Sequence, residues 1–313
     1  MNFDLCSEAA LVTGGTDGIG KEVARGLARA GLHVLVVGRD PDKGARAVKD
    51  IIHTTGNAAI QFLPADLSLT SEVNRLADVV AAHCPALHYL VHSAGIVRGR
   101  REVTAEGIES NFAVNYVSRF ALTIRLLPQL RRAGRMGTAA RIVIVGGAAQ
   151  NGTIHFEDVN LTANFSTLRA VSQFCQANDM FTVEMASRLQ TNENIPGVTI
   201  TCLKIGAVKT NIRREFPLWM KLLVPLLIDP LLAQAREEVA ETVLSLLRSP
   251  EFEGVTGALF LKIRKFRKIE TNSRALGPDN RKRLWELSER LIGVAPSLAM
   301  ADVGIPLYEG KRT

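Results

Sequence analysis

The residues best suited to chemistry in this sequence form a glycine-rich run at residues 13–20, Thr-Gly-Gly-Thr-Asp-Gly-Ile-Gly. An apolar, strand-like segment precedes the run and a helix-like segment follows it. Glycines in that context allow a tight turn, bring the backbone close to a pyrophosphate and aim a helix N-terminus at its charge. We therefore expect a dinucleotide site whose contacts here come from Gly14, Thr16, Asp17, Gly18, Ile19 and Gly20.

Two further side chains stand where expected strands end. Arg39 follows the second strand, where a carboxylate would accept the ribose 2′-hydroxyl of NAD(H) and a guanidinium would instead pair with a 2′-phosphate. The sequence therefore predicts NADP(H) as the cofactor, with a simple solvent-facing cap on the strand as the alternative for Arg39. Asp66, followed by Leu67, is placed to hydrogen-bond an adenine amine, or else to cap the helix that begins near residue 69.

The elements that must position these residues alternate along the chain. Apolar runs predict buried strands at 9–12, 33–37, 59–63, 87–91, 141–145 and 198–203. Amphipathic stretches predict helices at 18–30, 41–54, 69–82, 106–133 and 170–190. Near-continuous apolar strands, each followed by a helix, indicate an α/β fold with a single doubly wound, Rossmann-type parallel sheet covered on both faces. We expect one domain over residues 1–263 and a basic, helical C-terminal extension over 264–313.

Composition excludes several classes of protein. The 313 residues are 47% hydrophobic and 22% charged, which is ordinary for a globular chain and excludes a disordered or collagen-like one. A net charge of +7 favours anionic ligands without singling out nucleic acid, and the basic run at 262–268 is interpreted as a solvated edge. The four cysteines have no metal-ligand spacing, so we expect reduced thiols and no metal.

The location of the protein is predicted from two segments. The short stretch before the first strand leaves no room for a signal peptide, so we expect a cytoplasmic protein. Residues 216–232 are strongly apolar but contain Lys221, Asp229 and three prolines, which makes them too broken to be a transmembrane segment. We interpret 211–232 as an apolar lid, with a shallow dip into a bilayer surface as the alternative.

Over nearly its whole length the sequence resembles the short-chain dehydrogenase/reductase family, and its retinol-dehydrogenase-like branch most closely. Residues 13–20 are similar to that family's TGxxxGIG, residues 92–95 resemble its NNAG, and Asn115 matches its structural and proton-relay asparagine. The resemblance implies the Rossmann-type fold and a possible homodimer built from the helices expected at 106–133 and 170–190. It also adds three expected cofactor contacts, Ser93, Ala94 and Gly95.

The resemblance breaks where the family does its chemistry. The family uses a serine, a tyrosine and a lysine four residues after the tyrosine. Flanking motifs at 152–159 and 181–186 align these positions with Gly147, Val171 and Cys175. None of the three tyrosines is followed four residues later by lysine. Losing a general acid typically costs a factor of roughly 10²–10⁴, so ordinary carbonyl reduction is expected near background.

Three hypotheses remain for the function. The first, which the missing residues favour, is non-redox chemistry such as cyclisation, isomerisation or elimination on a small, mostly apolar metabolite in a biosynthetic pathway. Its candidate catalytic groups are Asn115, His155, Asp158 and Lys204, with Cys175 interpreted as a small filler. The second is a cofactor- or partner-binding protein without turnover. The third is an NADP(H)-dependent oxidoreductase with relocated acid and base groups, because hydride transfer itself needs only a positioned nicotinamide and carbonyl.

Overall fold

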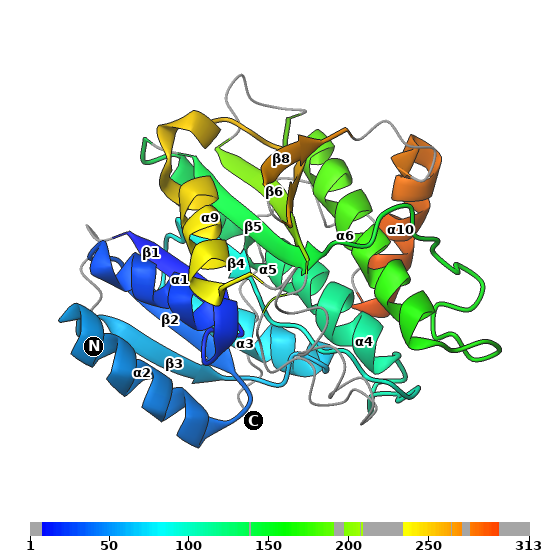
Figure 1. Cartoon of the computed structure of the whole chain (residues 1–313), viewed down its shortest axis with the longest axis horizontal. Helices are drawn as coiled ribbons and strands as arrows, with labels where there is room; N and C mark the ends of the chain where they lie inside the picture. The colour runs from blue at the N-terminus through cyan, green and yellow to red at the C-terminus, as the bar shows by residue number, and fades with distance from the viewer. Residues whose placement is uncertain are drawn as a thin grey trace, which may run out of the picture.

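The computed structural model describes residues 8–137, 139–190, 197–206, 208, 234–263, 265–270 and 276–293. Within them lies one eight-stranded sheet of order β3-β2-β1-β4-β5-β6-β7-β8, parallel except for β8 (Figure 1). Its strands are β1 (Ala9–Thr13), β2 (His33–Gly38), β3 (Ile60–Pro64), β4 (Tyr89–His92), β5 (Ala140–Gly147), β6 (Val198–Ile205), β7 (Ala258–Lys262) and β8 (Phe266–Ile269). This confirms the predicted α/β, Rossmann-type fold, because the central strands are apolar and buried along their whole length.

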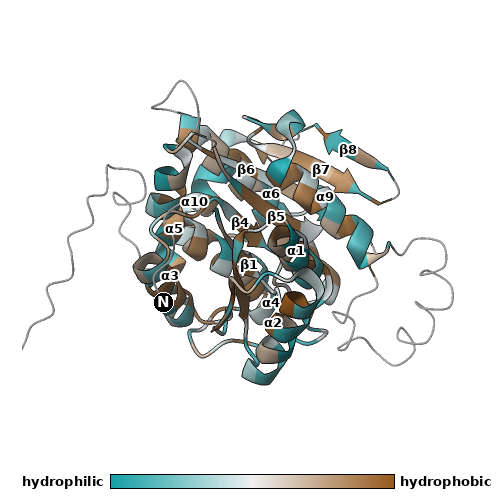
Figure 2. Ribbon diagram, turned by 90° about the vertical axis from the view of Figure 1, so that its left-hand side faces the viewer, coloured by the Kyte–Doolittle hydropathy of each residue, from teal (hydrophilic) through white to brown (hydrophobic). Residues whose placement is uncertain are grey.

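Helices cover both faces of the sheet. One face packs against α1 (Gly18–Arg29), α2 (Pro41–Thr55) and α9 (Arg236–Arg248). The other packs against α3 (Thr70–His83), α5 (Ser118–Gly134) and α6 (Thr167–Gln190), with α10 (Pro278–Leu291) lying on α6. Figure 2 shows hydrophobic strands at the centre and hydrophilic residues on the outer sides of the helices. The two apolar cores that result fix the carboxyl ends of the strands along one edge.

The helix expected at 106–133 is divided into three parts. A short α4 (Ser110–Phe112) leads into one π-helical turn, η1 (Ala113–Val117), before α5 begins at Ser118. Single π-turns inside helices are frequent at functional sites. This π-helical turn contains Asn115, which the sequence predicts to be a functional residue.

The chain after residue 263 continues the same body. β8 pairs with β7, with Phe260 opposite Lys268, and a 3₁₀ turn, η4 (Pro250–Phe252), lies beside them. The exposed side chains of β8 include Arg267 and Lys268, and charged residues of this kind protect an edge strand from pairing with other chains. The expected lid at 211–232 lies outside the described residues. Among the helices described, none is long and apolar enough to cross a membrane.

Helix α10 is anchored in the core by aromatic contacts. Trp285 lies 5.0 Å from the ring of Phe120 and 6.2 Å from that of Phe181, and its indole nitrogen donates to Glu289 at 2.7 Å. The hydroxyls of Tyr116 and Ser288 are 2.6 Å apart. The C-terminal helix therefore shares a core with α5 and α6.

We predict that Trp285→Ala lowers the free energy of unfolding by about 3–5 kcal/mol, because it removes a large buried ring from between two helices. Glu286→Ala, on the exposed side of the same helix, should change it by less than about 0.5 kcal/mol. Urea denaturation followed by circular dichroism measures both. A loss below about 0.5 kcal/mol for Trp285→Ala would contradict the account of α10 as part of the core.

Candidate cofactor and catalytic site

The turn after β1 is locked against the loop after β4. Thr13 Oγ1 donates to the Val91 carbonyl at 3.3 Å and accepts from the backbone amides of Ser93 and Ala94 at 3.2 and 3.3 Å. A Cβ at Gly14, where φ is +69°, would lie 2.8 Å from the Cα of Ala94. Only glycine fits there, so the two loops that are expected to hold the cofactor touch through their backbones.

The N-terminus of α1 packs directly on this turn. A Cβ at Gly20 would lie 2.5 Å from the carbonyl oxygen of Gly14. Asp17 caps the helix by accepting from the Gly18 amide at 2.8 Å, and its second oxygen pairs with Lys43 Nζ at 2.6 Å. The first-turn amides and the helix dipole therefore face the carboxyl edge of the sheet, which is the geometry that binds a pyrophosphate. The residues present fit a dinucleotide.

The tip of β2 presents a cation rather than a carboxylate. Arg39 is exposed directly after the strand. Asp40 beside it is committed to capping α2, because it accepts from the Lys43 amide at 3.0 Å, and this hydrogen bond lowers the pKa of the Asp40 carboxyl. The arrangement fits a 2′-phosphate at the tip of β2, and the role of Arg39 stays a prediction.

Asp66 does not serve as the cap of α3. Its carboxylate accepts from the Ser68 amide at 2.9 Å, while the first amides of the helix, at Thr70 and Ser71, donate to Glu106. Glu106 therefore supplies the cap from 35 residues away in sequence. The alternative interpretation of Asp66 is thereby removed, and its proposed contact with adenine stays a prediction. Leu67 next to it is buried.

Asn115 joins the loop after β4 to α6. Its side chain donates to the Ile96 carbonyl at 2.8 Å and accepts from the Ile96 amide at 3.2 Å. The π-helical turn leaves its own carbonyl free to accept from Asn178 Nδ2 at 3.0 Å. In this structure Asn115 positions the loop that carries Ser93, Ala94 and Gly95, and a catalytic role for it stays a prediction.

The positions aligned with the family's serine and lysine lie against each other. A Cβ at Gly147, at the end of β5, would come within 2.9 Å of the Cys175 sulfur. Val171, Cys175 and Asp179 follow one another at four-residue spacing and so share one side of α6. Burial raises the pKa of the Cys175 thiol, which is the opposite of what an activated nucleophile needs. Cys175 therefore fills space, as expected.

An ion pair is buried beneath these positions. Lys204 on β6, opposite Gly146 of β5, binds the Asp179 carboxylate, and the two residues are 1% and 5% exposed. Burial raises the pKa of Asp179 to about 6, against the opposing effect of Lys204. Lys204 thus lies close to where the family's lysine would be, although it comes from a different element.

A second buried cation, Arg119, comes from α5. Its guanidinium donates to the Ala94 carbonyl at 2.8 Å and to Asn178 Oδ1 at 3.3 Å, and burial lowers its pKa to about 10. Sequence reasoning missed both Arg119 and Asp179. The available signal was a charged residue within each of two apolar helix patterns.

The remaining candidates lie in the loop before α6. The backbone amide of His155 donates to Gln173 Oε1 at 2.9 Å, and Gln173 in turn donates to the Val159 carbonyl. The Asp158 carboxylate accepts from Thr162 and Ala163 and so closes a local turn. Gln173 fastens this loop to α6. The catalytic roles suggested for His155 and Asp158 stay predictions.

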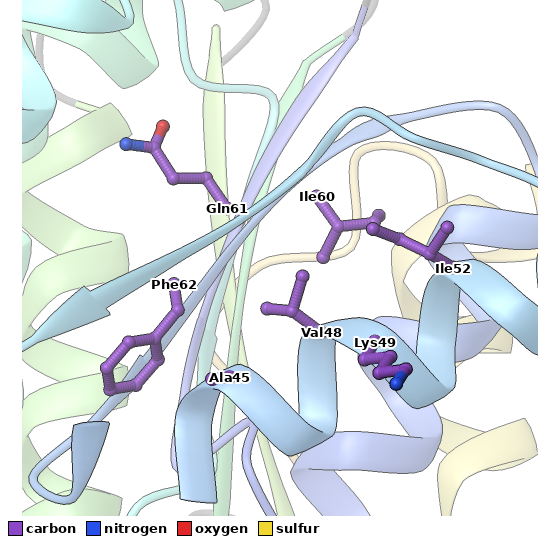
Figure 3. A pocket seen from close by; sticks show the side chains of 7 residues that line it. All are labelled: Ala45, Val48, Lys49, Ile52, Ile60, Gln61 and Phe62. Atoms are coloured by element: carbon purple, nitrogen blue, oxygen red, sulfur yellow. The ribbon is translucent and has the colours of Figure 1, made fainter. Parts of the chain in front are cut away.

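A separate apolar groove lies between α2 and β3, with a volume of about 500 Å³ (Figure 3). It is lined by Ala45, Val48, Lys49, Ile52, Ile60, Gln61 and Phe62. None of these residues belongs to the predicted site. The groove lies at the far edge of the sheet from β5 and β6, so it is not the place where the cofactor and substrate are expected to meet.

Comparison with known proteins now identifies the family. The family model for short chain dehydrogenases matches residues 8–221, so the chain belongs to that family. It is 33% identical over 285 residues to polyprenol dehydrogenase of Mus musculus, covering 91% of this chain and 83% of that protein. It is 32% identical over 294 residues to retinol dehydrogenase 12 of Homo sapiens, covering 94% and 89%.

Solved structures share the fold. The RhlG protein of Pseudomonas aeruginosa, in an active-site complex with NADP, superposes with a TM-score of 0.65 at 24% identity, covering 81% of this chain and 94% of that one. A 3-ketoacyl-(acyl-carrier-protein) reductase of Brucella melitensis, complexed with NADH, gives a TM-score of 0.61 at 20% identity, covering 82% and 97%. Nicotinamide dinucleotides of both kinds are therefore bound by proteins of this fold.

These relatives correct one expectation. Non-redox chemistry, whether cyclisation, isomerisation or elimination, was the function that the sequence favoured, and this prediction is wrong. The relatives that cover nine-tenths of the chain are named dehydrogenases, and nothing in the site favours another class of reaction. The error lay in treating the loss of proton-transfer residues as a loss of hydride transfer, which depends on the cofactor instead.

The buried pair predicts a dependence of stability on pH. Because the pKa of Asp179 is raised to about 6 from the ordinary 3.8, the folded state holds that proton more tightly than the unfolded one. This contribution to stability is complete below pH 4 and is lost as the pH rises through about 6. As the pH rises from 4 to 6, the free energy of unfolding of Asp179→Asn should therefore increase by on the order of 2–3 kcal/mol relative to that of wild type.

Asp158→Asn is the matched control, because hydrogen bonds from Ala163 and Thr162 lower the pKa of that carboxyl. The effect of Asp158→Asn on the free energy of unfolding, relative to wild type, should have the opposite sign: a loss that grows as the pH rises toward the ordinary pKa of 3.8 and is constant above it. Denaturant titrations at several pH values measure both. A difference between Asp179→Asn and wild type that does not vary with pH would contradict this account of the pair.

Proposed function

We propose that the protein is an NADP(H)-dependent oxidoreductase that interconverts a large apolar alcohol and the corresponding carbonyl compound. The observation that carries the proposal is the cofactor half of the site, in which the turn after β1, the N-terminus of α1 and the loop after β4 are packed together by backbone contacts. The polyprenol and retinol dehydrogenases among the relatives support both the reaction class and an apolar alcohol as substrate.

Individual parts of the chain would divide the work of binding. The amides of residues 18–20 and the helix dipole would hold the pyrophosphate, and Arg39 would pair with the 2′-phosphate. Asp66 would contact the adenine, and the loop of Ser93, Ala94 and Gly95, held by Asn115, would support the nicotinamide half. When bound, NADP(H) supplies or accepts the hydride.

Proton transfer would differ from that of the family. Neither Gly147 nor Val171 can donate a proton, and burial raises the pKa of Cys175, so no side chain at these positions serves as the general acid. The substrate oxygen would exchange its proton with solvent. The cost is the typical contribution of a positioned general acid, a factor of roughly 10²–10⁴ in rate.

We predict that the protein binds NADPH more tightly than NADH and that Arg39→Ala weakens NADPH binding by about tenfold without changing NADH binding, because one charged contact to the 2′-phosphate is lost. Arg29→Ala removes the same charge from the other end of α1 and should leave both affinities unchanged. Isothermal titration calorimetry measures the affinities of wild type and of both variants for the two cofactors. Equal loss for both cofactors, or no loss, would contradict the assignment of Arg39.

We further predict that Gly147→Ser with Val171→Tyr, combined with Cys175→Ala to make room for the serine Cβ, raises the reduction rate of a long-chain prenal or retinal by roughly 10²-fold, because it supplies a hydroxyl and a general acid. The same triple variant with Val171→Phe in place of Val171→Tyr supplies the same ring without the hydroxyl and should gain little. NADPH oxidation, followed by absorbance, gives the rates. A wild type that binds NADPH but oxidises none with either substrate would contradict the proposed activity.

A further inference from the structure

Three buried ionisable side chains lie around Cys175, the position aligned with the family's lysine, and each acts on the pKa of its thiol. Arg119 on α5, Asp179 on α6 and Lys204 on β6 are 4%, 5% and 1% exposed, and we call them the buried charge cluster. Two cations and one carboxylate leave a net charge of +1 above the pKa of Asp179. A lysine at position 175 would have supplied that same charge. The net positive charge near this position therefore comes from α5 and β6.

The cluster lies beneath the part of the site that would receive the nicotinamide. The pyrophosphate and adenosine would lie along one half of the carboxyl edge, because the turn after β1 and Arg39 after β2 are located there. The other half of a dinucleotide must then lie over the ends of β4 to β6, given the strand order. Arg119 binds the carbonyl of Ala94 just after β4, and Lys204 lies opposite Gly146 near the end of β5.

Some polar atoms of the buried charge cluster have no hydrogen-bond partner among the residues that the structure describes. Arg119 Nε and Asp179 Oδ1 are buried and have no hydrogen-bond partner within the described part of the chain. Within the described residues, the hydrogen bonds of Arg119 go to neutral oxygens, those of the Ala94 carbonyl and the Asn178 amide. No carboxylate of that part of the chain pairs directly with Arg119, and in a low-dielectric interior such a charge acts over a longer range than at the surface.

We propose that the buried charge cluster makes the site bind the reduced cofactor, NADPH, more tightly than the oxidised cofactor, NADP⁺. The inference rests on the proposed cofactor-binding function. The nicotinamide ring is neutral in NADPH and positively charged in NADP⁺. A net positive charge below the ring repels only the oxidised form. At the dielectric of a partly buried site, one unit of charge changes the ratio of the two affinities by roughly tenfold.

The test compares cofactor affinities among variants that differ in the net charge of the cluster. Dissociation constants for NADPH and NADP⁺ are measured by calorimetry at pH 8, above the pKa of Asp179 and below that of Arg119. Relative to wild type at +1, Arg119→Met gives a net charge of 0 and should reduce the preference for NADPH about tenfold. Asp179→Asn gives +2 and should increase it about tenfold.

Two controls separate charge from structure. The double variant Lys204→Met with Asp179→Leu removes the ion pair but keeps the net charge at +1, so it should keep the wild-type ratio. Arg125→Met removes an exposed arginine from the same helix as Arg119 and should also keep it. The affinity for 2′,5′-ADP, which lacks the nicotinamide half, should be equal in all five proteins. Melting temperatures establish that each variant is folded.

The outcomes are distinct. A ratio that follows net charge across the variants supports the inference, and Asp179→Asn alone tests its direction if Arg119→Met does not fold. A ratio that changes in the charge-neutral double variant, or stays constant in both Arg119→Met and Asp179→Asn, overturns it. If wild type binds 2′,5′-ADP but neither NADPH nor NADP⁺, or binds none of the three, the proposed function itself fails.

Discussion

The backbone contact between Gly14 and Ala94 is the constraint on which the site depends. It brings the turn after β1 within van der Waals reach of the loop after β4, and Thr13 adds hydrogen bonds to the same loop. Through this contact the N-terminus of α1 is aimed at the carboxyl edge, and Arg119 reaches the Ala94 carbonyl from the opposite face. A Cβ at position 14 would separate the two halves of the dinucleotide site.

The two halves of the proposed cofactor site differ in composition. The half that would hold pyrophosphate and adenosine keeps glycines, a helix cap and a cation at the tip of β2. The half proposed to hold the nicotinamide contains Gly147, Val171 and Cys175, and its buried cations, Arg119 and Lys204, come from α5 and β6. Under the proposed function, cofactor binding and proton transfer would depend on different residues, as the physical roles of cofactor and protein suggest.

Much of the fold, and the glycine turn that begins the proposed cofactor site, could be predicted because the signals are local. Continuous apolar runs and a glycine turn lie within a few residues of each other, so periodicity and motif spacing find them. The pairs that define the other half are separated along the chain: Lys204 and Asp179 by 25 residues, and Arg119 and Asn178 by 59. Only the packing of α5 and α6 on the sheet brings them together. Sequence patterns contain no record of that proximity.

The most direct test of the account is a single-turnover experiment with excess protein, NADPH deuterated at C4 of the nicotinamide and a long-chain apolar aldehyde. Mass spectrometry of the products measures whether deuterium moves from cofactor to substrate. The account predicts an alcohol that carries one deuterium at its carbinol carbon, formed slowly because solvent supplies the proton. Aldehyde that stays unreduced while NADPH is bound would contradict it, and would leave a dinucleotide-binding protein without redox activity.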